Sequence, residues 1–183
     1  MNNTAQVPEL IVIVGPIASG KSTIAYELGS RFPAAGRAVA VLDLDDVVDT
    51  IGGFAGLTSE RFRQAQLVYG DLVGAWLRQR RDVVAHGPFF EPEEDEALLH
   101  AVPAGVTPRR VQLLATYEVA LERTTLDSDR GLSKDPKLLR FAYDRVASLL
   151  STMPPSEWTF DTTTRSSREI VDTLAAVFLP ERA

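Results

Sequence analysis

The chain of 183 residues contains no cysteine and only two histidines, His86 and His100. Without cysteine it can form no disulfide bond, no thiolate nucleophile and no thiolate metal ligand. Two histidines are also too few for a histidine-rich metal site. The sequence therefore excludes every class of protein that depends on cysteine chemistry.

Long apolar runs are absent as well. The longest, Leu10–Val14, has the length of a strand, whereas a membrane-spanning helix needs about 20 apolar residues. Residues 1–8 lack a basic region followed by an apolar stretch, so we expect no signal peptide and a cytoplasmic protein. The 19 basic and 25 acidic residues give a net charge of −6, which provides no broad attraction to nucleic acid or anionic lipid. We therefore expect neither as a partner, and the oligomeric state stays open.

The pattern of apolar residues predicts one α/β domain. Apolar residues make up 45% of the chain and charged residues 24%, which is ordinary for a globular protein. No repeat and no linker divides the chain, so we expect a flexible tail over residues 1–8 and a single domain over residues 9–183. Short β-branched runs alternate with longer amphipathic stretches, which is typical of a mainly parallel sheet covered by helices on both faces. The predicted strands are Leu10–Val14, Ala38–Leu42, Asp82–His86, Arg110–Ala115 and Glu157–Phe160.

Helical spacing predicts which residues of three helices are buried. A helix from Ser59 to about Arg80 would bury Phe62, Ala65, Tyr69, Leu72, Val73 and Trp76. A helix that begins at Asp135-Pro136 would bury Leu139, Ala142, Val146, Leu149 and Leu150. A last helix, with a capping box of Ser166 and Glu169, would bury Ile170, Val171, Leu174, Val177 and Phe178. The acidic segment Glu91–Glu96 is expected to be a solvated helix start.

Residues 15–22 read G-P-I-A-S-G-K-S and match the phosphate-binding motif G-x-x-x-x-G-K-[ST] in full. An apolar strand precedes the motif and a helix can follow it, so backbone N–H groups and the helix N-terminus would face a bound phosphate. Gly15 and Gly20 would permit backbone angles that other residues resist. Lys21 would contact the β- and γ-phosphates, and Ser22 would hold Mg²⁺. The residues expected to contact ATP in this segment are Gly15, Ala18, Ser19, Gly20, Lys21, Ser22 and Thr23.

Two carboxylates follow the second predicted strand. In an extended segment residues two apart face the same way, so Asp43 and Asp45 would both point at the carboxyl edge of the sheet, where ligands of α/β proteins bind. One acid could order Mg²⁺ and the other could orient an attacking hydroxyl or accept its proton. A helix N-terminus that is simply lined with acids is the alternative reading.

These features together resemble the shikimate kinase-like branch of the small P-loop kinases, from Leu10 to about Leu179. The resemblance implies ATP and Mg²⁺ as cofactors, with Asp43 supporting the metal and Asp45 holding the substrate hydroxyl. Arg63, which follows Phe62 as in the family's F-R pair, would bind substrate. Arg140, followed by Tyr143, resembles a second substrate-binding arginine of that family.

The same resemblance assigns the nucleotide and lid residues. Arg123 resembles the arginine that stacks on adenine, and Arg130 resembles the arginine of the mobile lid, here about residues 127–136. The loop around Thr163 would wrap the base. Lys21, Asp45 and Arg130 are therefore the residues expected to act in catalysis. A plain loop in place of the lid remains an alternative.

The third strand departs from the family. Shikimate kinases end this strand with a glycine triplet, whereas this chain has His86 and Gly87, followed by Pro88, Phe89 and Phe90. We expect His86 and Gly87 to face the substrate, although a packing or capping histidine is an equal alternative. The changed residues predict a related kinase that acts on a different small molecule.

The predicted function is transfer of the γ-phosphoryl group of ATP to a hydroxyl of a small molecule. Two alternatives remain at this point. One is a nucleotide-dependent switch or ATPase without an acceptor, and the other is a kinase of nucleotides or polynucleotide ends. The sequence identifies neither the acceptor nor, by itself, ATP over GTP.

Overall fold

The computed structural model describes residues 7–126 and 135–180. Most of the predicted tail and most of the predicted lid, including Arg130, lie outside the described residues. Within the described ranges, no helix is both long enough and apolar enough to cross a membrane. The prediction of one domain over residues 9–183 stays a prediction.

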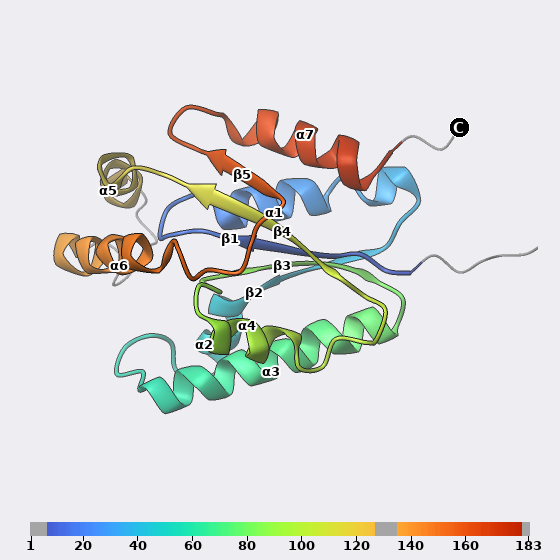
Figure 1. Cartoon of the computed structure of the whole chain (residues 1–183), viewed down its shortest axis with the longest axis horizontal. Coiled ribbons are helices and arrows are strands. Elements are labelled where there is room, and N and C mark those ends of the chain that lie inside the picture. The colour runs from blue at the N-terminus through green and yellow to red at the C-terminus, as the bar shows by residue number, and fades with distance from the viewer. Residues whose placement is uncertain (1–6, 127–134, 181–183) are drawn as a thin grey trace, which may run out of the picture.

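Five parallel strands form one sheet, in the order β2-β3-β1-β4-β5 (Figure 1). The strands are β1 (Leu10–Val14), β2 (Val39–Asp43), β3 (Asp82–Gly87), β4 (Pro108–Leu114) and β5 (Trp158–Asp161). Each predicted strand is present, with bounds that differ by at most two residues. The predicted α/β P-loop kinase architecture, with a parallel sheet covered on both faces, is confirmed.

The central strand β1 divides its side chains between two cores. Leu10, Val12 and Val14 face one core, and Ile11 and Ile13 face the other, as the alternation of a strand requires. Both faces are apolar because helices cover both. Helices α1 (Lys21–Gly29) and α7 (Ser167–Phe178) cover one face, and helices α2 (Leu44–Thr50), α3 (Ser59–Arg78) and α4 (Pro92–Leu99) cover the other (Figure 1). A short 3₁₀ helix, Pro33–Ala35, follows α1.

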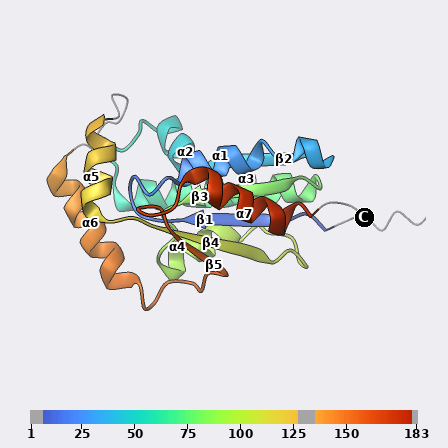
Figure 2. The same ribbon diagram turned by 90° about the horizontal axis from the view of Figure 1, so that it is seen from above.

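The last two helices lie beyond the carboxyl ends of the strands. Helix α5 (Tyr117–Leu126) follows β4, and helix α6 (Pro136–Leu149) packs beside it (Figure 2). A small third core joins them to the loop after β1 through Ala18, Ala120 and Leu139. The carboxyl edge of the sheet is therefore flanked by α5 and α6 on one side and by α2 on the other.

The buried face of α3 differs from the prediction. Leu72 and Trp76 were expected in the core but are 40% and 42% exposed. The helix instead buries Gly70 against α4 and Gly74 against Ala101, just beyond the end of α4, while Tyr69 and Val73 face the sheet. A pattern of large apolar residues does not indicate this second contact, because close helix packing uses glycines, which have no side chain. Val177 and Leu150 were also expected to be buried and are 40% and 51% exposed.

Gly70→Ala is expected to destabilise the fold by about 2–3 kcal/mol, on the scale of overpacked cores. The new Cβ would overlap with the carbonyl oxygen of Ala97 in α4, and a backbone atom cannot move aside cheaply. Helix propensity alone predicts the opposite sign, since alanine is favoured over glycine by about 1 kcal/mol. Urea unfolding measures the change, with Gln64→Ala on the exposed face of α3 as the control. A stabilised Gly70→Ala variant would contradict the close α3–α4 contact.

Glu94 corrects the prediction of a solvated acidic segment. This side chain is buried at 8% exposure, and its carboxylate accepts hydrogen bonds from the backbone N–H groups of Phe90 and Glu91. Burial raises the pKa of Glu94, while these two hydrogen bonds act in the opposite direction. Glu94 therefore caps its own helix and fixes the turn that leads away from β3.

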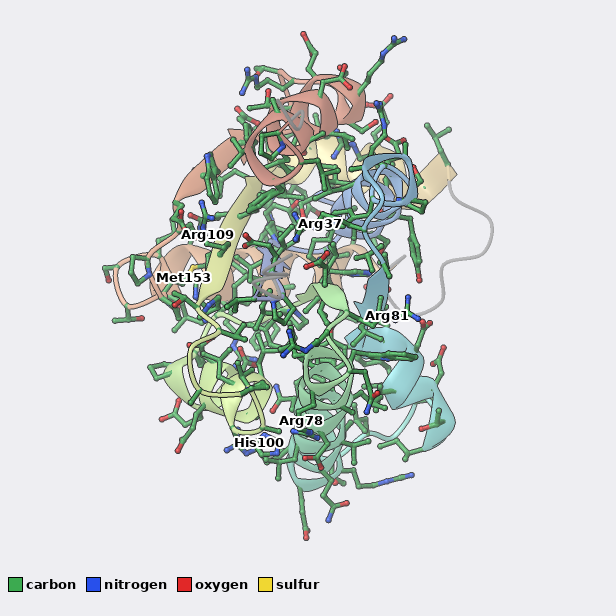
Figure 3. The ribbon with its side chains drawn as sticks, turned by 90° about the vertical axis from the view of Figure 1, so that its right-hand side faces the viewer. Arg37, Arg78, Arg81, His100, Arg109 and Met153 are labelled. Atoms are coloured by element: carbon green, nitrogen blue, oxygen red, sulfur yellow. The ribbon has the colours of Figure 1, made fainter. Side chains whose placement is uncertain are left out.

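The amino-terminal edge of the sheet is held by a buried ion pair. Arg37 donates to both oxygens of Asp82, from Nε at 2.8 Å and from Nη2 at 2.6 Å. Its Nη1 donates to the carbonyl of Phe178, and Asp82 also accepts the backbone N–H of Glu9. Figure 3 faces this edge and labels Arg37. The edge is occupied by structural contacts, which leaves the opposite, carboxyl edge for a functional site.

Candidate active site

The loop between β1 and α1 is shaped to receive an anion. Gly20 is the N-cap of α1 at a φ of +92°, and Ala18 also has a positive φ, of 59°. No side chain caps this helix and no acidic residue lies in its first turn. The free N–H groups and the positive end of the helix dipole therefore face the loop. This is the arrangement that binds phosphate in P-loop proteins.

Gly15 is required for a different reason from the one predicted. Its φ is not positive, so backbone freedom does not explain it. A Cβ at Gly15 would lie 2.5 Å from Ser19 Oγ and 2.6 Å from the carbonyl oxygen of Leu113. The glycine lets the loop lie against β4, and the buried hydroxyl of Ser19 has no hydrogen-bond partner in the described part of the chain.

Lys21 reaches back over the loop. Its Nζ donates to the carbonyl oxygens of Gly15 and Pro16, each at 3.0 Å. The ammonium charge also acts on Asp43 and Asp45: burial raises the pKa of both carboxyl groups, and Lys21 opposes part of that rise. A phosphate in the loop would therefore meet a positive charge that is already in place.

Asp43 and Asp45 are not arranged as the sequence predicted. Strand β2 ends at Asp43, which is the N-cap of α2 and accepts the backbone N–H of Asp45 at 3.0 Å on Oδ1. Asp45 stands in the first turn of the helix, so the alternation of an extended strand does not apply to it. The acid-lined helix N-terminus, the alternative reading, is what forms. The charge of Asp43 nevertheless reaches the carboxyl group of Asp45 and contributes to raising its pKa.

The protonation of these acids is shifted by their surroundings. Asp45 reaches solvent, but the protein atoms crowded around it remove much of its hydration, and this together with the charge of Asp43 raises the pKa of Asp45 to about 6. Burial likewise raises the pKa of Asp43. A carboxyl group with a pKa near neutrality is suited to accept a proton at physiological pH.

Ser22 and Asp43 face each other across the start of α1. Ser22 Oγ lies 3.5 Å from Asp43 Oδ2. Hydroxyl and carboxylate oxygens suit Mg²⁺, which uses few protein ligands and takes the rest from phosphate and water. No cluster of three acidic or histidine side chains within the described ranges could hold a metal alone. The residues present therefore fit a magnesium ion that arrives with a nucleotide.

His86 is buried beside these acids. Its ring is fully inaccessible, and Nδ1 lies 3.5 Å from Asp43 Oδ1. Burial, with a smaller contribution from the charge of Lys21, lowers the pKa of His86 to about 4, so the ring is neutral at neutral pH. The next residue, Gly87, has no room for a Cβ, which would lie 2.9 Å from the ring of Phe89 and 3.2 Å from Leu44.

A hollow of about 700 Å³ continues from the loop towards the end of β5. Residues of the loop, of α5 and of the segment after β5 line it; they are Ala18, Ser19, Gly20, Thr23, Ile24, Arg123, Leu126, Thr162, Thr163, Thr164, Arg165, Ser166 and Ser167. Arg123 donates to the carbonyl of Ala18 at 2.9 Å and to the carbonyl of Thr162 at 2.7 Å. This arginine ties the phosphate-binding loop to the segment expected to surround the base.

Threonine hydroxyls hold that segment in place. Thr163 Oγ1 accepts the backbone N–H of Thr116 at 3.1 Å, and Thr162 Oγ1 donates to the carbonyl of Leu114 at 3.0 Å. In the sequence, the run of three threonines after a predicted strand is the feature that indicates this segment. The hydrogen bond from Arg123 to Thr162 forms because α5 lies beside this segment in the fold, and no local pattern in the sequence predicts it.

Two arginines expected at the substrate make contacts with neighbouring parts of the protein. Arg63 donates to the carbonyl of Glu93 at the start of α4. The guanidinium of Arg140 lies 3.4 Å from the centroid of the Tyr117 ring. Within the described part of the chain, neither arginine has a hydrogen bond or ion pair with Asp45. Their predicted contact with substrate stays a prediction, as does the role of Arg130.

Tyr69 is a residue that the sequence reading placed only in the core. It is buried, but its hydroxyl donates to the carbonyl of Leu42 at 2.8 Å and accepts the backbone N–H of His86 at 3.0 Å. These bonds join the ends of β2 and β3 beneath the acids. Helical spacing predicts that Tyr69 is buried, but it does not predict the hydrogen-bond partners of its hydroxyl.

Comparison with known proteins gives partial matches in sequence and full-length matches in fold. A tRNA dimethylallyltransferase of Rhizobium etli (strain CIAT 652) is 38% identical over 87 residues, which are 43% of this chain. The chain spans only 28% of the length of that curated relative.

Solved structures match over nearly the whole chain. A sugar kinase from Janibacter sp. HTCC2649 has a TM-score of 0.67 at 15% identity and covers 94% of this chain and 96% of its own. A shikimate kinase from Acinetobacter baumannii, in complex with shikimate, has a TM-score of 0.59 at 22% identity, with 96% and 94% covered. These likenesses confirm the resemblance to small P-loop kinases at the level of the fold. A family model described as an AAA domain matches residues 10–134, well over half of the sequence, and the chain therefore belongs to the AAA_33 family.

Proposed function

We propose that the chain is an ATP-dependent phosphotransferase that moves the γ-phosphoryl group to a hydroxyl of a small molecule. One observation carries the proposal: a carboxylate, Asp45, lies at the carboxyl edge of the sheet within the electrostatic reach of Lys21 of the phosphate-binding loop. A nucleotide switch needs no such group beside its phosphates. A phosphotransferase needs it to orient the accepting hydroxyl.

The phosphate-binding loop holds the nucleotide. Its N–H groups and the N-terminus of α1 bind phosphate oxygens, and Lys21 exchanges its carbonyl contacts for the β- and γ-phosphates. Ser22 and Asp43 hold Mg²⁺, which when bound neutralises charge on the phosphate oxygens. The hollow between Arg123 and Thr163 takes the base and ribose.

Asp45 orients the acceptor hydroxyl and accepts its proton. Phosphoryl transfer depends mainly on positioning and charge stabilisation, so alignment of the hydroxyl with the γ-phosphorus is the main task. The raised pKa of Asp45 keeps the carboxyl close to the protonation equilibrium at neutral pH. Arg130, in the proposed lid, would bring positive charge to the transferred group.

The acceptor is proposed to differ from shikimate. Phe89 and Phe90 follow β3 and are buried at 1% and 7% exposure, in place of an open glycine triplet. A screen of hydroxyl-bearing metabolites for acceptor-dependent ATP consumption, followed by mass spectrometry of the product, tests the function. ATP consumption that no acceptor stimulates would favour the switch or ATPase instead.

Arg123→Ala is expected to weaken nucleotide binding by about tenfold or more while leaving the fold intact. The variant loses the two bonds from Arg123 to the carbonyls of Ala18 and Thr162, so the base segment and the loop are no longer tied together. Loss of charge-assisted hydrogen bonds of this kind costs about 1.5–3 kcal/mol. Titration calorimetry with ATP measures the affinity. The control is Arg165→Ala, which removes another arginine that lines the same hollow, and an effect equal to that of Arg123→Ala would contradict the specific role.

A further inference from the structure

We infer that His86 is a positioning residue for the metal site: its Nδ1–H holds Oδ1 of Asp43, so that Oδ2 is presented to Mg²⁺ beside Ser22. The inference rests on the proposed function, because Mg²⁺ arrives with the nucleotide. It assigns His86 to the metal side of the site, in place of the predicted contact with substrate.

The first support is the burial of an unsatisfied polar ring. The His86 side chain is 1% exposed, and neither ring nitrogen has a hydrogen-bond partner in the described part of the chain. A buried nitrogen without a partner costs about 1–3 kcal/mol. The carboxylate oxygen that approaches Nδ1 is Oδ1 of Asp43, at 3.5 Å. That separation is just longer than the usual hydrogen-bond range of about 2.7–3.2 Å, so a small movement completes the bond.

The second support is the rigid placement of the two residues. Asp43 and His86 are register partners on the parallel strands β2 and β3, so their side chains leave neighbouring strands at the same level. The hydroxyl of Tyr69 bonds the backbone of both strands at this point. The ring of Tyr26 in α1 meets the His86 ring edge-on, with centroids 5.9 Å apart. The imidazole is therefore enclosed and keeps its direction towards Asp43.

The third support is the division of contacts on the Asp43 carboxylate. Oδ1 accepts the backbone N–H of Asp45 at 3.0 Å and faces His86, while Oδ2 faces Ser22. One oxygen is thus held by the protein and the other is left on the side of the metal. A carboxylate fixed in this way cannot rotate to exchange its oxygens, and partners of this kind commonly change metal affinity by 10–100-fold.

The arrangement specifies the tautomer of the ring. A neutral imidazole carries one N–H, and donation to the carboxylate requires the proton on Nδ1. Nitrogen-15 NMR of the unmodified chain distinguishes the two tautomers without any substitution. A proton on Nδ1 is expected, and a ring protonated on Nε2 alone would overturn the inference.

Two substitutions separate the hydrogen bond from the packing of the ring. His86→Asn places an amide N–H near the position of Nδ1, whereas His86→Leu fills similar space without a donor. Titration calorimetry measures the affinity for a non-hydrolysable ATP analogue with Mg²⁺ and, separately, with excess chelator. For His86→Leu we expect the Mg²⁺-dependent gain in affinity to fall by about 10–100-fold, with metal-free binding unchanged. His86→Asn is expected to retain most of the gain.

The outcomes distinguish the inference from the proposed function. An unchanged metal dependence in His86→Leu, with normal nucleotide binding, overturns the role of His86 alone. Absence of nucleotide binding in the unmodified chain overturns the proposed function and the inference with it. Thermal unfolding of each variant identifies a folding defect, and in that case the NMR assignment of the tautomer decides the question.

Discussion

Lys21→Ala is expected to reduce phosphoryl transfer by at least about 10³-fold, the scale at which a charge on the transferred phosphoryl group acts. The ammonium is held at the loop by two carbonyl oxygens at 3.0 Å, so it is preorganised for the phosphates. Removing it takes away a positive charge that offsets the negative charge on the phosphate oxygens in the proposed mechanism. The loss should be larger in turnover than in nucleotide affinity, because the backbone N–H groups of the loop still bind phosphate.

Turnover and ATP affinity of the Lys21→Ala variant are measured with the acceptor that the metabolite screen identifies. Lys137→Ala is the matched control, since Lys137 lies exposed on α6 and its removal takes the same charge from the chain. Thermal unfolding should be nearly unchanged in both variants. Equal turnover in Lys21→Ala and the unmodified chain would contradict the assignment of the phosphate-binding loop.

The fold followed from the sequence because its signals are local. Short β-branched apolar runs such as Leu10–Val14 are typical of buried strands, and the loop motif predicts the strand-to-helix turn that follows. The wrong predictions concern which face of a helix is buried, where the packing of a second helix decides it. Trp76 has the spacing of a core residue but is exposed, because Gly70 on another side of α3 accepts the close approach of α4. A single sequence does not show which side of a helix its neighbour will take.

The candidate site was predicted in its residue types more than in its geometry. Lys21 and Ser22 are specified by a motif with fixed spacing, and the structure places them in the first turn of α1. The relation of Asp43 to Asp45 depended on the conformation after β2. The prediction assumed an extended segment, whereas helix α2 begins at Leu44, directly after Asp43, and contains Asp45. The partners of His86 and Arg123 come from other elements of the fold, so no local sequence pattern predicts these contacts.

Asp45→Asn is expected to lower phosphoryl transfer by about 10²-fold or more, the usual size of a general acid–base contribution. The amide keeps the size of the side chain and one acceptor oxygen, but it cannot take the proton of the hydroxyl. The first-turn position of Asp45 in α2 is held through its backbone N–H to Asp43, which the substitution keeps, and its carboxylate is not one of the groups proposed to bind the phosphates. ATP affinity and stability should therefore change little.

Asp46→Asn is the control that isolates the position of the charge. Asp46 is the next residue in the same helical turn and is also exposed, so both variants lose one negative charge from the start of α2. If general electrostatics around the loop set the rate, the two substitutions should have similar effects. If Asp45 holds the acceptor hydroxyl, only Asp45→Asn should lose turnover, and the loss should appear with every acceptor. Equal rates in the two variants would remove Asp45 from the mechanism, because the loss of one negative charge at either position would then have the same effect on turnover.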